Sequence, residues 1–261
     1  MRYLRLFGLF FRIGVMGELA YRVNFFVHLF VSLLDLGTAL GGLMIVFAHV
    51  STLGGWRQDE VLALVGVYFL VGGFIRLLIQ PSMERLIESV REGTLDFTLT
   101  KPEDAQILIS VQRVEIWSLT DVVLGIGVLA LALARLGAGV RSWHAVAFAV
   151  ALAAGIVIVY SFWLMLATLS FWFVKVENIL MIFQSMYEAG RWPVSLYPSW
   201  LRFALTFLVP IAFATTVPAQ ALAGHLTWRI LLGAVALALA LFLVSRVFWQ
   251  TAIRRYSGAS A

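Results

Sequence analysis

Long apolar segments with almost no charged residues are the feature that most constrains how this chain can fold. Residues 25–50, 61–80, 107–136, 145–174 and 228–244 form five such segments. The first four are long enough to cross a hydrocarbon layer of about 30 Å as a helix, and residues 228–244 form the body of the last span. Because lipid offers no hydrogen-bond partners to backbone groups, helices are the expected spanning elements. The sequence therefore predicts an all-α membrane protein.

The composition agrees with this class and excludes others. Hydrophobic residues make up 62% of the chain and charged residues only 13%, whereas a soluble domain carries about a quarter charged residues. The net charge is +5, but the basic residues are scattered at the ends of the apolar segments. That distribution is typical of membrane orientation and not of a nucleic-acid-binding face. The chain has no cysteine, which excludes disulfides, thiolate nucleophiles and Cys-ligated zinc.

A sixth crossing is expected between residues 175 and 227, in one of two places. Residues 178–190 form a short apolar run, and residues 203–225 form a longer one that Pro210 and Pro218 interrupt. Either the first run spans and the second re-enters the membrane, or the first is interfacial and the second spans. Both alternatives give six transmembrane helices, with both termini on one side.

The distribution of Lys and Arg predicts which side that is. With the first alternative, thirteen of the 19 basic residues lie on the side of the termini and six on the other. Cytoplasmic loops carry the excess of Lys and Arg. We therefore expect both termini, and the hydrophilic connection over residues 82–106, in the cytoplasm.

The connection over residues 82–106 is predicted to begin with a short amphipathic helix. Met83, Leu86, Ile87 and Val90, the apolar stripe, recur at helical spacing with charges opposite. Pro81 is expected to close the preceding span, and Gly93 is expected to end the short helix. An apolar stripe on a cytoplasmic helix is typical of a helix that docks on a partner.

Signatures of catalysis are missing from the sequence. There is no G-x-x-x-x-G-K-[ST] loop, no H-E-x-x-H pattern and no G-x-S-x-G motif, and the four histidines are dispersed. We therefore predict no catalytic, cofactor-binding or metal-ligating residue, and no enzymatic activity of the chain by itself.

Four acidic residues lie in or near the apolar segments: Asp35, Glu115, Asp121 and Glu188. An Asp at the centre of a spanning helix costs about 2.5–3.5 kcal/mol on insertion scales. Such acids either line a cavity that contacts a cationic substrate or pair with Arg, Lys or Tyr across the bundle. Asp35 and Asp121 lie deepest and are the candidates for the pathway, with pairing the more frequent outcome. The glycine pairs Gly41-Gly42 and Gly72-Gly73 are expected to permit close helix packing.

The segment R-E-G-T-L-D-F-T-L-T-K-P, residues 91–102, resembles the loop between spans 2 and 3 of type-2 ABC exporter permeases. In that family the loop reads roughly E-R-G-T-L-E-x-L-L-x-T-P. Gly93, Thr94, Leu95, Leu99 and Pro102 match, and Asp stands at position 96 where the family has Glu. Positions 98 and 101 depart from the pattern.

The resemblance continues over nearly the whole chain. Residues 5–26 look like the interfacial elbow helix of that family, residues 166–178 like the turn from span 4 to span 5, and residues 209–224 like its re-entrant segment. The ending R-V-F-W-Q-T-A-I-R-R-Y-S-G-A-S is similar to the final span of a bacterial subgroup of daunorubicin- or viologen-exporter-like permeases.

The resemblance implies the membrane-spanning permease subunit of an ATP-binding-cassette exporter. One transmembrane domain would cover residues 1–261, with an interfacial elbow helix (1–24), a cytoplasmic coupling loop (82–106) and an extracytoplasmic re-entrant region (191–227). The residues that would contact the ATPase are Met83, Leu86, Ile87, Val90, Arg91, Glu92, Gly93, Thr94, Leu95 and Asp96, and Pro210 and Pro218 would break the re-entrant helices.

The same resemblance implies the partners and the location. A dimer of cytoplasmic ATPase subunits would bind ATP and Mg²⁺, and this chain would bind no cofactor. A second, related permease would complete the pathway, with a heterodimer favoured over a homodimer. The protein would lie in the inner or plasma membrane of a bacterium, in contact with lipid and with no nucleic acid.

Two other functions fit the residues. An ATP-independent secondary transporter or channel would show intramembrane acids that titrate or bind ions, and full activity without an ATPase. An assembly subunit would bind partners but show no flux of substrate.

Overall fold

The structure, a computed structural model, describes residue 8 and residues 22–137, 142–173 and 177–256. Within these residues the regular structure is helical, apart from one isolated bridge between Leu53 and Trp56. Five helices are long and apolar enough to cross a membrane, and one bent helix pair is a sixth candidate. The predicted all-α membrane class is confirmed. The elbow helix predicted over residues 1–24 lies outside the described residues, apart from residues 8 and 22–24.

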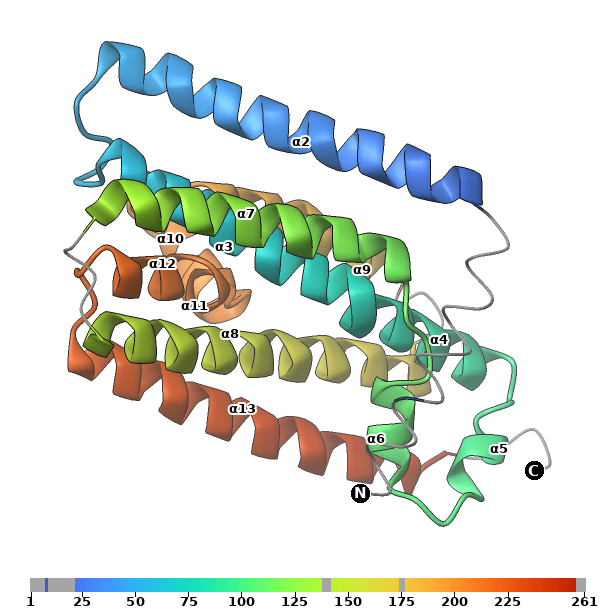
Figure 1. The fold of residues 1–261 in the computed structure, drawn as a ribbon. Helices are drawn as coiled ribbons and strands as arrows, with labels where there is room; N and C mark the ends of the chain where they lie inside the picture. Colours follow the sequence, from blue (N-terminus) through green and yellow to red (C-terminus); the bar gives the residue numbers. More distant parts are fainter. Residues whose placement is uncertain (1–7, 9–21, 138–141, 174–176, 257–261) are drawn as a thin grey trace.

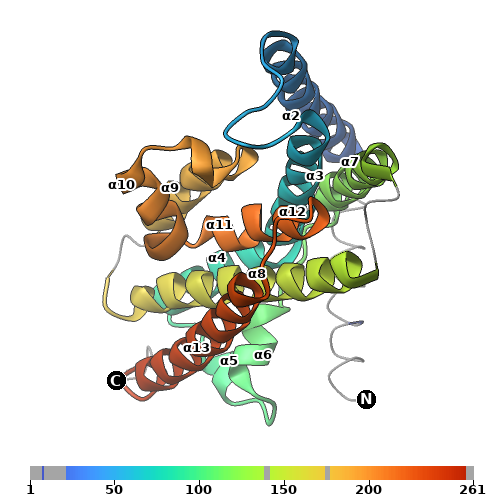
Figure 2. The same ribbon diagram turned by 90° about the vertical axis from the view of Figure 1, so that its left-hand side faces the viewer.

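The long helices are α2 (Arg22–His49), α3 (Gln58–Phe74), α7 (Leu119–Leu136), α8 (Ser142–Thr168) and α13 (Trp228–Ile253). They lie one above another in the view of Figure 1, and Figure 2 shows that α8 runs at an angle across the direction of α2, α3 and α7. The short helices α5 (Asp96–Leu99) and α6 (Ala105–Ser110) lie at one end of the bundle, near the start of α2 and the end of α13. We call this the α5 end, and the opposite end the α12 end.

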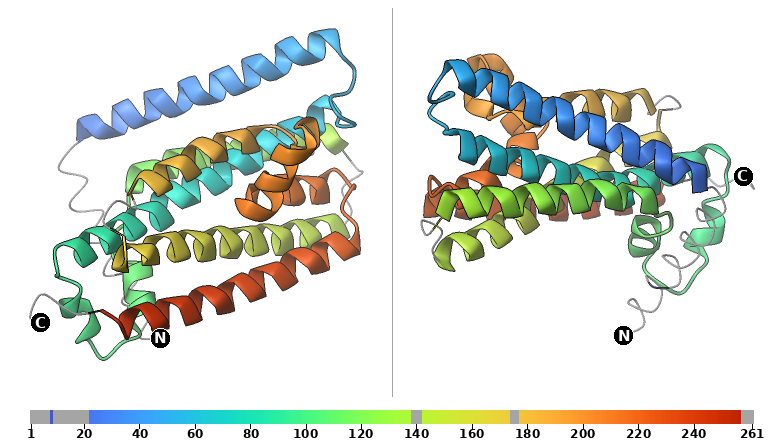
Figure 3. Two further views of the ribbon diagram at one scale, coloured as in Figure 1. Left: turned by 180° about the vertical axis from the view of Figure 1, so that it is seen from behind. Right: turned by 45° about the horizontal axis from the view of Figure 1, so that its top comes forward.

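Helix α2 lies at the edge of the bundle, as Figure 2 and the left view of Figure 3 show. Most of its apolar side chains, among them Phe26, Phe30, Met44 and Ile45, are exposed. Such a surface is stable in lipid, where apolar side chains need no further cover. Helix α3 is the most enclosed of the long helices, and the window of highest hydropathy in its span is 72% buried.

The second span is longer than the sequence predicts, because Pro81 does not end it. Helix α3 continues through a π-helical turn (Ile75–Ile79) into α4 (Gln80–Arg91), giving 34 continuous residues. Proline lacks a backbone N–H and clashes with the preceding turn. Here Pro81 falls in the first turn of α4, directly after the π turn, where the regular hydrogen-bond ladder is already interrupted. At 1.5 Å per residue the helix is about 51 Å long.

The third span is shorter than predicted. Residues 107–110 belong to α6, the chain then breaks over residues 111–115, and the spanning helix starts at Ile116. The break is held against the second span. The Glu115 N–H donates to the Leu77 carbonyl at 2.9 Å, and the Ser82 hydroxyl donates to the Arg113 carbonyl at 3.0 Å. The backbone of this stretch therefore forms hydrogen bonds with the neighbouring helix where it does not continue as a helix itself.

Glycines bring α3 and α7 into close contact. A Cβ atom added at Gly66 would lie 2.9 Å from the Leu129 nitrogen, and one added at Gly73 would lie 2.7 Å from the Val122 nitrogen. The packing role expected for Gly72-Gly73 is confirmed at Gly73. It is wrong for Gly41, where a Cβ would meet nothing within 4 Å.

The chain between α8 and α13 first runs along the bundle and then folds back. Helix α9 (Glu177–Tyr187) and the turn Glu188–Arg191 lead from the α5 end toward the α12 end (Figure 1, Figure 3). There the Ser195 hydroxyl donates to the Gly54 carbonyl at 3.4 Å. Residue 54 lies in the loop between α2 and α3, so residue 195 lies at the same end as that loop.

A bent helix pair follows. The segments Ser199–Leu208, which contains α10 (Ser199–Phe203), and Ile211–Leu222, which contains α11 (Ile211–Ala214) and α12 (Thr216–Leu222), meet at 70°. Two glycines leave room for α11 to pack closely against its neighbours. A Cβ atom at Gly155, the middle of α8, would lie 2.7 Å from the Phe213 carbonyl oxygen, and one at Gly190 would lie 2.7 Å from the Ile211 side chain. The bend therefore reaches the middle of the bundle.

Candidate coupling and translocation sites

The apolar stripe of α4 faces the interior of this chain. Met83 and Leu86 are fully buried and Ile87 is 2% exposed, because α4 packs against α6 and α8. The expectation that these side chains are presented to a partner is therefore wrong. An amphipathic helix covers its apolar face with whatever surface it meets, and here that surface belongs to the same chain.

The motif after α4 has the predicted turn. Helix α4 ends at Arg91, and Gly93 adopts the left-handed conformation with φ +70°. The Thr94 N–H then donates to the Ser89 carbonyl at 2.9 Å, a hydrogen bond typical of a glycine-terminated helix. Gly93 therefore ends the helix as predicted. Glu92 and Arg91 are exposed, Thr94 and Asp96 are half-buried, and Leu95 is 1% exposed.

The residue that this segment does present is Phe97. This residue is 76% exposed and belongs to α5, at the α5 end of the bundle. Leu95 and Leu99, four residues apart, face inward, so a residue two positions from each must face away. The spacing of the two leucines therefore predicts that Phe97 is exposed. The residues predicted to contact the ATPase ended at Asp96 and did not include it. Lys101 and Thr100 are exposed beside it.

A polar network joins this segment to the bundle. The Arg246 guanidinium of α13 donates to both carboxylate oxygens of Asp104, one at 2.9 Å, and to the Gln106 side-chain oxygen at 2.8 Å. The Gln106 amide donates to the Tyr160 hydroxyl at 3.1 Å, and Tyr160 lies 2.7 Å from the Ser110 hydroxyl. We call these five residues the Asp104–Arg246 network.

The Asp104 carboxylate also caps α6. It accepts hydrogen bonds from the backbone N–H groups of Gln106 and Ile107 at 2.9 and 3.4 Å. The hydrogen bond from Arg246 lowers the pKa of the Asp104 carboxyl below its usual value. Asp104 is therefore ionised at neutral pH. No sequence pattern predicts this network, because its members are up to 142 residues apart.

Both acids predicted for the pathway are paired. The Arg76 guanidinium contacts Asp121 at 2.9 Å, and the Asp121 side chain is 3% exposed. Arg191 lies 3.8 Å from Asp35, whose side chain is 58% exposed. The pairing expected as the more frequent outcome is what the structure shows. Glu115 likewise lies 3.7 Å from Arg113.

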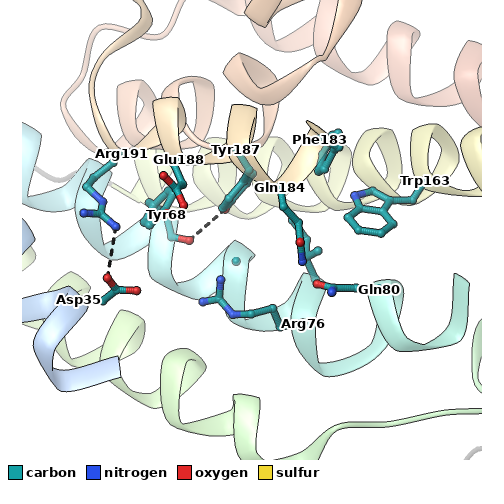
Figure 4. Close-up of a pocket in the computed structure, with 12 residues that line it drawn as sticks. Asp35, Tyr68, Arg76, Gln80, Trp163, Phe183, Gln184, Tyr187, Glu188 and Arg191 are labelled. Carbon is teal, nitrogen blue, oxygen red and sulfur yellow. Dashed lines mark hydrogen bonds and ion pairs between the residues drawn. The ribbon is translucent and has the colours of Figure 1, made fainter. Parts of the chain in front are cut away.

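A cavity of about 210 Å³ opens beside these pairs, between α2, α3, α8 and α9 (Figure 4). Its wall is both aromatic and polar. The lining side chains are Asp35, Tyr68, Ile75, Arg76, Gln80, Trp163, Phe183, Gln184, Tyr187, Glu188 and Arg191, together with Gly72. A concave site that combines aromatic walls with a few polar groups is typical of ligand binding.

A second cavity of about 300 Å³ lies nearer the α5 end. Glu84, Glu88, Arg91, Arg113, Leu180 and Met181 line it, and Gln184 lines both cavities. In the described part of the chain, no group of three His, Asp or Glu side chains could hold a metal ion.

The two prolines of the predicted re-entrant region occupy different positions. Pro210 lies between the two segments of the bent pair, at the bend. Pro218 lies in the first turn of α12, where its missing N–H removes no helical hydrogen bond. The loop after α12 is tied to the start of α3, because the His225 ring lies 3.2 Å from the buried Glu60 carboxylate.

Comparison with known proteins agrees with this architecture. The model of the family described as ABC-2 family transporter protein matches residues 33–260, which is most of the chain. A comparison with curated proteins returns no match.

Proposed function

Because the chain belongs to the ABC-2 family of transporter proteins, we propose that it is the membrane-spanning permease subunit of an ATP-driven exporter. Members of this family are membrane transport components. The proposed protein is multi-pass and lies in a bacterial inner or plasma membrane, and hydrolysis of ATP takes place on a separate subunit. The proposal has two parts, a topology and a surface that engages the ATPase.

The proposed topology has six crossings and cytoplasmic termini. The five long helices supply five of them, and α9 with the turn to Arg191 supplies the sixth. At 1.5 Å per residue this last segment is about 22 Å long, short for a membrane core of about 30 Å. The bent pair then re-enters from the outside and returns, as the position of residue 195 beside residue 54 supports.

The observation that carries the proposed coupling is the exposed Phe97 on a projection beyond the membrane. The second span is about 51 Å long and the membrane core about 30 Å. Part of α4, with α5 and α6, therefore extends into the cytoplasm when the termini are cytoplasmic. A large aromatic side chain exposed to water has the chemistry of a docking anchor.

In this proposal the ATPase moves the projection and the projection moves the bundle. Two ATPase subunits close together when they bind ATP, and this biases two permeases toward one of two arrangements. The Asp104–Arg246 network gives the projection a direct contact with α8 and α13. The second permease is proposed to be a related chain, and a homodimer is the other arrangement.

Replacement of Phe97 tests the coupling directly. Because truncation of an interface anchor costs about 2 kcal/mol or more, Phe97→Ala is expected to weaken association with the ATPase that co-purifies with the wild-type chain by tenfold or more. The stimulated ATPase rate falls with it. Binding by titration of detergent-solubilised proteins is the measurement.

Phe207→Ala is the matched control, because Phe207 is 66% exposed on the bent pair, away from α5. It should leave the association unchanged. Unchanged association of Phe97→Ala would argue against the proposed surface. Full transport in proteoliposomes that contain no ATPase would instead support an ATP-independent transporter.

A further inference from the structure

A third cavity, of about 350 Å³, lies at the α5 end, where α4, α8 and α13 end near one another (Figure 1). Two arginines line it, Arg91 at the end of α4 and Arg255 just after α13. Apolar side chains form much of the remaining wall, among them Ile87, Phe171 and Phe173. Among the described residues no carboxylate lines this cavity, whereas both cavities beside α9 contain carboxylates.

The cavity keeps a positive charge. The Arg255 side chain is exposed and forms no ion pair with any described residue. Arg91 has an interaction of its own within the chain, so the uncompensated charge is that of Arg255. Tyr256 also lines the cavity, and burial, together with the charge of Asp96, raises the pKa of its hydroxyl. That hydroxyl is therefore uncharged at neutral pH and does not offset the arginines.

Aromatic side chains indicate that the cavity lies at the boundary of the membrane. The rings of Trp172 and Phe248 stack with centroids 5.4 Å apart. The Phe171 ring lies edge-on to those of Trp249 and Tyr256, at 5.7 and 5.6 Å. Tryptophan and tyrosine gather where the hydrocarbon core meets the lipid headgroups.

The end of the last span gives the same level. The span ends at Ile253, and Arg255 follows two residues later. Because a charged side chain is stable just outside the hydrocarbon core, the Arg255 guanidinium is expected at the depth of the lipid phosphate groups.

Apolar surface continues from the cavity to the outside of the bundle. Phe173, which lines the cavity, is 61% exposed, and the adjacent Trp172 is 40% exposed. Exposed aromatic side chains at the edge of a membrane are covered by acyl chains. A soluble phosphate compound would use the arginines but leave this surface uncovered, whereas a phospholipid matches both the charge and the apolar wall.

We propose that this cavity binds an acidic phospholipid, whose phosphate group is held by Arg255 and Arg91 and whose acyl chain packs against Phe173. A guanidinium group matches a phosphate with two parallel hydrogen bonds. Basic pockets between membrane helices on the cytoplasmic side are suited to acidic headgroups. The bound lipid connects the ends of α4, α8 and α13, and its binding depends neither on transport nor on an ATPase.

Native mass spectrometry of the purified full-length chain tests the site, because it resolves each bound lipid. The chain is titrated in neutral detergent with dioleoyl phosphatidylglycerol or with dioleoyl phosphatidylcholine, whose ammonium compensates the phosphate. The first phosphatidylglycerol is expected to bind about tenfold more tightly than phosphatidylcholine. Glycerol 3-phosphate, which has the phosphate without acyl chains, is expected not to displace it at about 1 mM.

Arg255→Gln should weaken phosphatidylglycerol binding by about tenfold or more and so remove the preference between the two lipids. Arg255→Lys keeps the charge without the planar fork and should retain part of the preference. Arg254→Gln is the matched control, because it removes the same charge at the neighbouring exposed position, outside the cavity. It should leave the preference nearly unchanged.

Thermal melting shows whether each variant is folded. If Arg255→Gln is not, Phe173→Ala tests the apolar wall, and it is expected to weaken the binding of both lipids alike. Three results would overturn the inference: equal affinity of the wild type for the two lipids, an unchanged preference in a folded Arg255→Gln variant, or displacement by glycerol 3-phosphate. The last would identify a soluble phosphate compound as the ligand. Failure of the ATPase to bind the chain would leave this inference intact.

Discussion

Single residues decide which charges of the membrane interior remain available. Arg76 and Arg191 each neutralise an acid from another helix. The paired acids, Asp121 and Asp35, therefore hold helices together. At the α5 end the same chemistry acts between Asp104 and Arg246, where a planar guanidinium matches both carboxylate oxygens.

Replacement of Arg246 tests the Asp104–Arg246 network. Arg246→Gln removes the bidentate pair and leaves the partly buried Asp104 without its strongest donor. Because both side chains are about one-third exposed, we expect a loss of about 1 kcal/mol, which corresponds to a melting temperature lower by a few degrees. Thermal melting in detergent measures the change.

Arg246→Lys separates charge from geometry, since lysine keeps the charge but has no planar fork. It should fall between the wild type and Arg246→Gln. Arg254→Gln, an exposed change just after α13, is the control. Equal stability of Arg246→Gln and Arg254→Gln would show that the network contributes nothing to the fold.

At the scale of helices, periodicity and length predicted most of the structure. The apolar segments at residues 25–50, 145–174 and 228–244 correspond to α2, α8 and α13. The errors occur where tertiary contacts override a local rule. A π-helical turn lets the second span continue past Pro81. Hydrogen bonds with Leu77 and Ser82 accompany the interruption of the helix before α7.

The same limit applies to the candidate sites. The spacing of the apolar stripe on α4 revealed an amphipathic helix, but it could not reveal that α8 would cover it. The partner of Asp121 could not be predicted either, because Arg76 lies 45 residues away in the sequence. A sequence pattern reports which face of an element is apolar or charged, and the fold alone decides what that face meets.

Close approach of α11 to α8 depends on Gly155. A methyl group there would lie 2.7 Å from the Phe213 carbonyl oxygen, within a tightly packed contact. We expect Gly155→Ala to lower the melting temperature by several degrees, since overpacking costs about 1–3 kcal/mol. Gly127→Ala is a matched control in α7, because a Cβ there meets nothing within 4 Å. Equal melting of the two variants would show that α11 does not need this contact.

For the whole molecule, the topology decides whether the proposed coupling surface can reach an ATPase. The chain has no cysteine, so single cysteines can be labelled without background. Ser51, Thr100 and Ser195 are exposed positions in three different connections. Thr100→Cys is expected to react with a membrane-impermeant maleimide only after the cells are permeabilised, because the excess of Lys and Arg predicts that this connection lies inside.

Ser51→Cys and Ser195→Cys are expected to react in intact cells, since residues 54 and 195 are in contact at the α12 end. Labelling of Ser195→Cys only after permeabilisation would mean that α9 does not cross and that the bent pair spans the membrane. Labelling of Thr100→Cys in intact cells would place Phe97 outside the cell, where no ATPase could bind it. Ser195→Cys therefore tests the re-entrant region and Thr100→Cys tests the coupling surface. Either expected result can fail while the other holds.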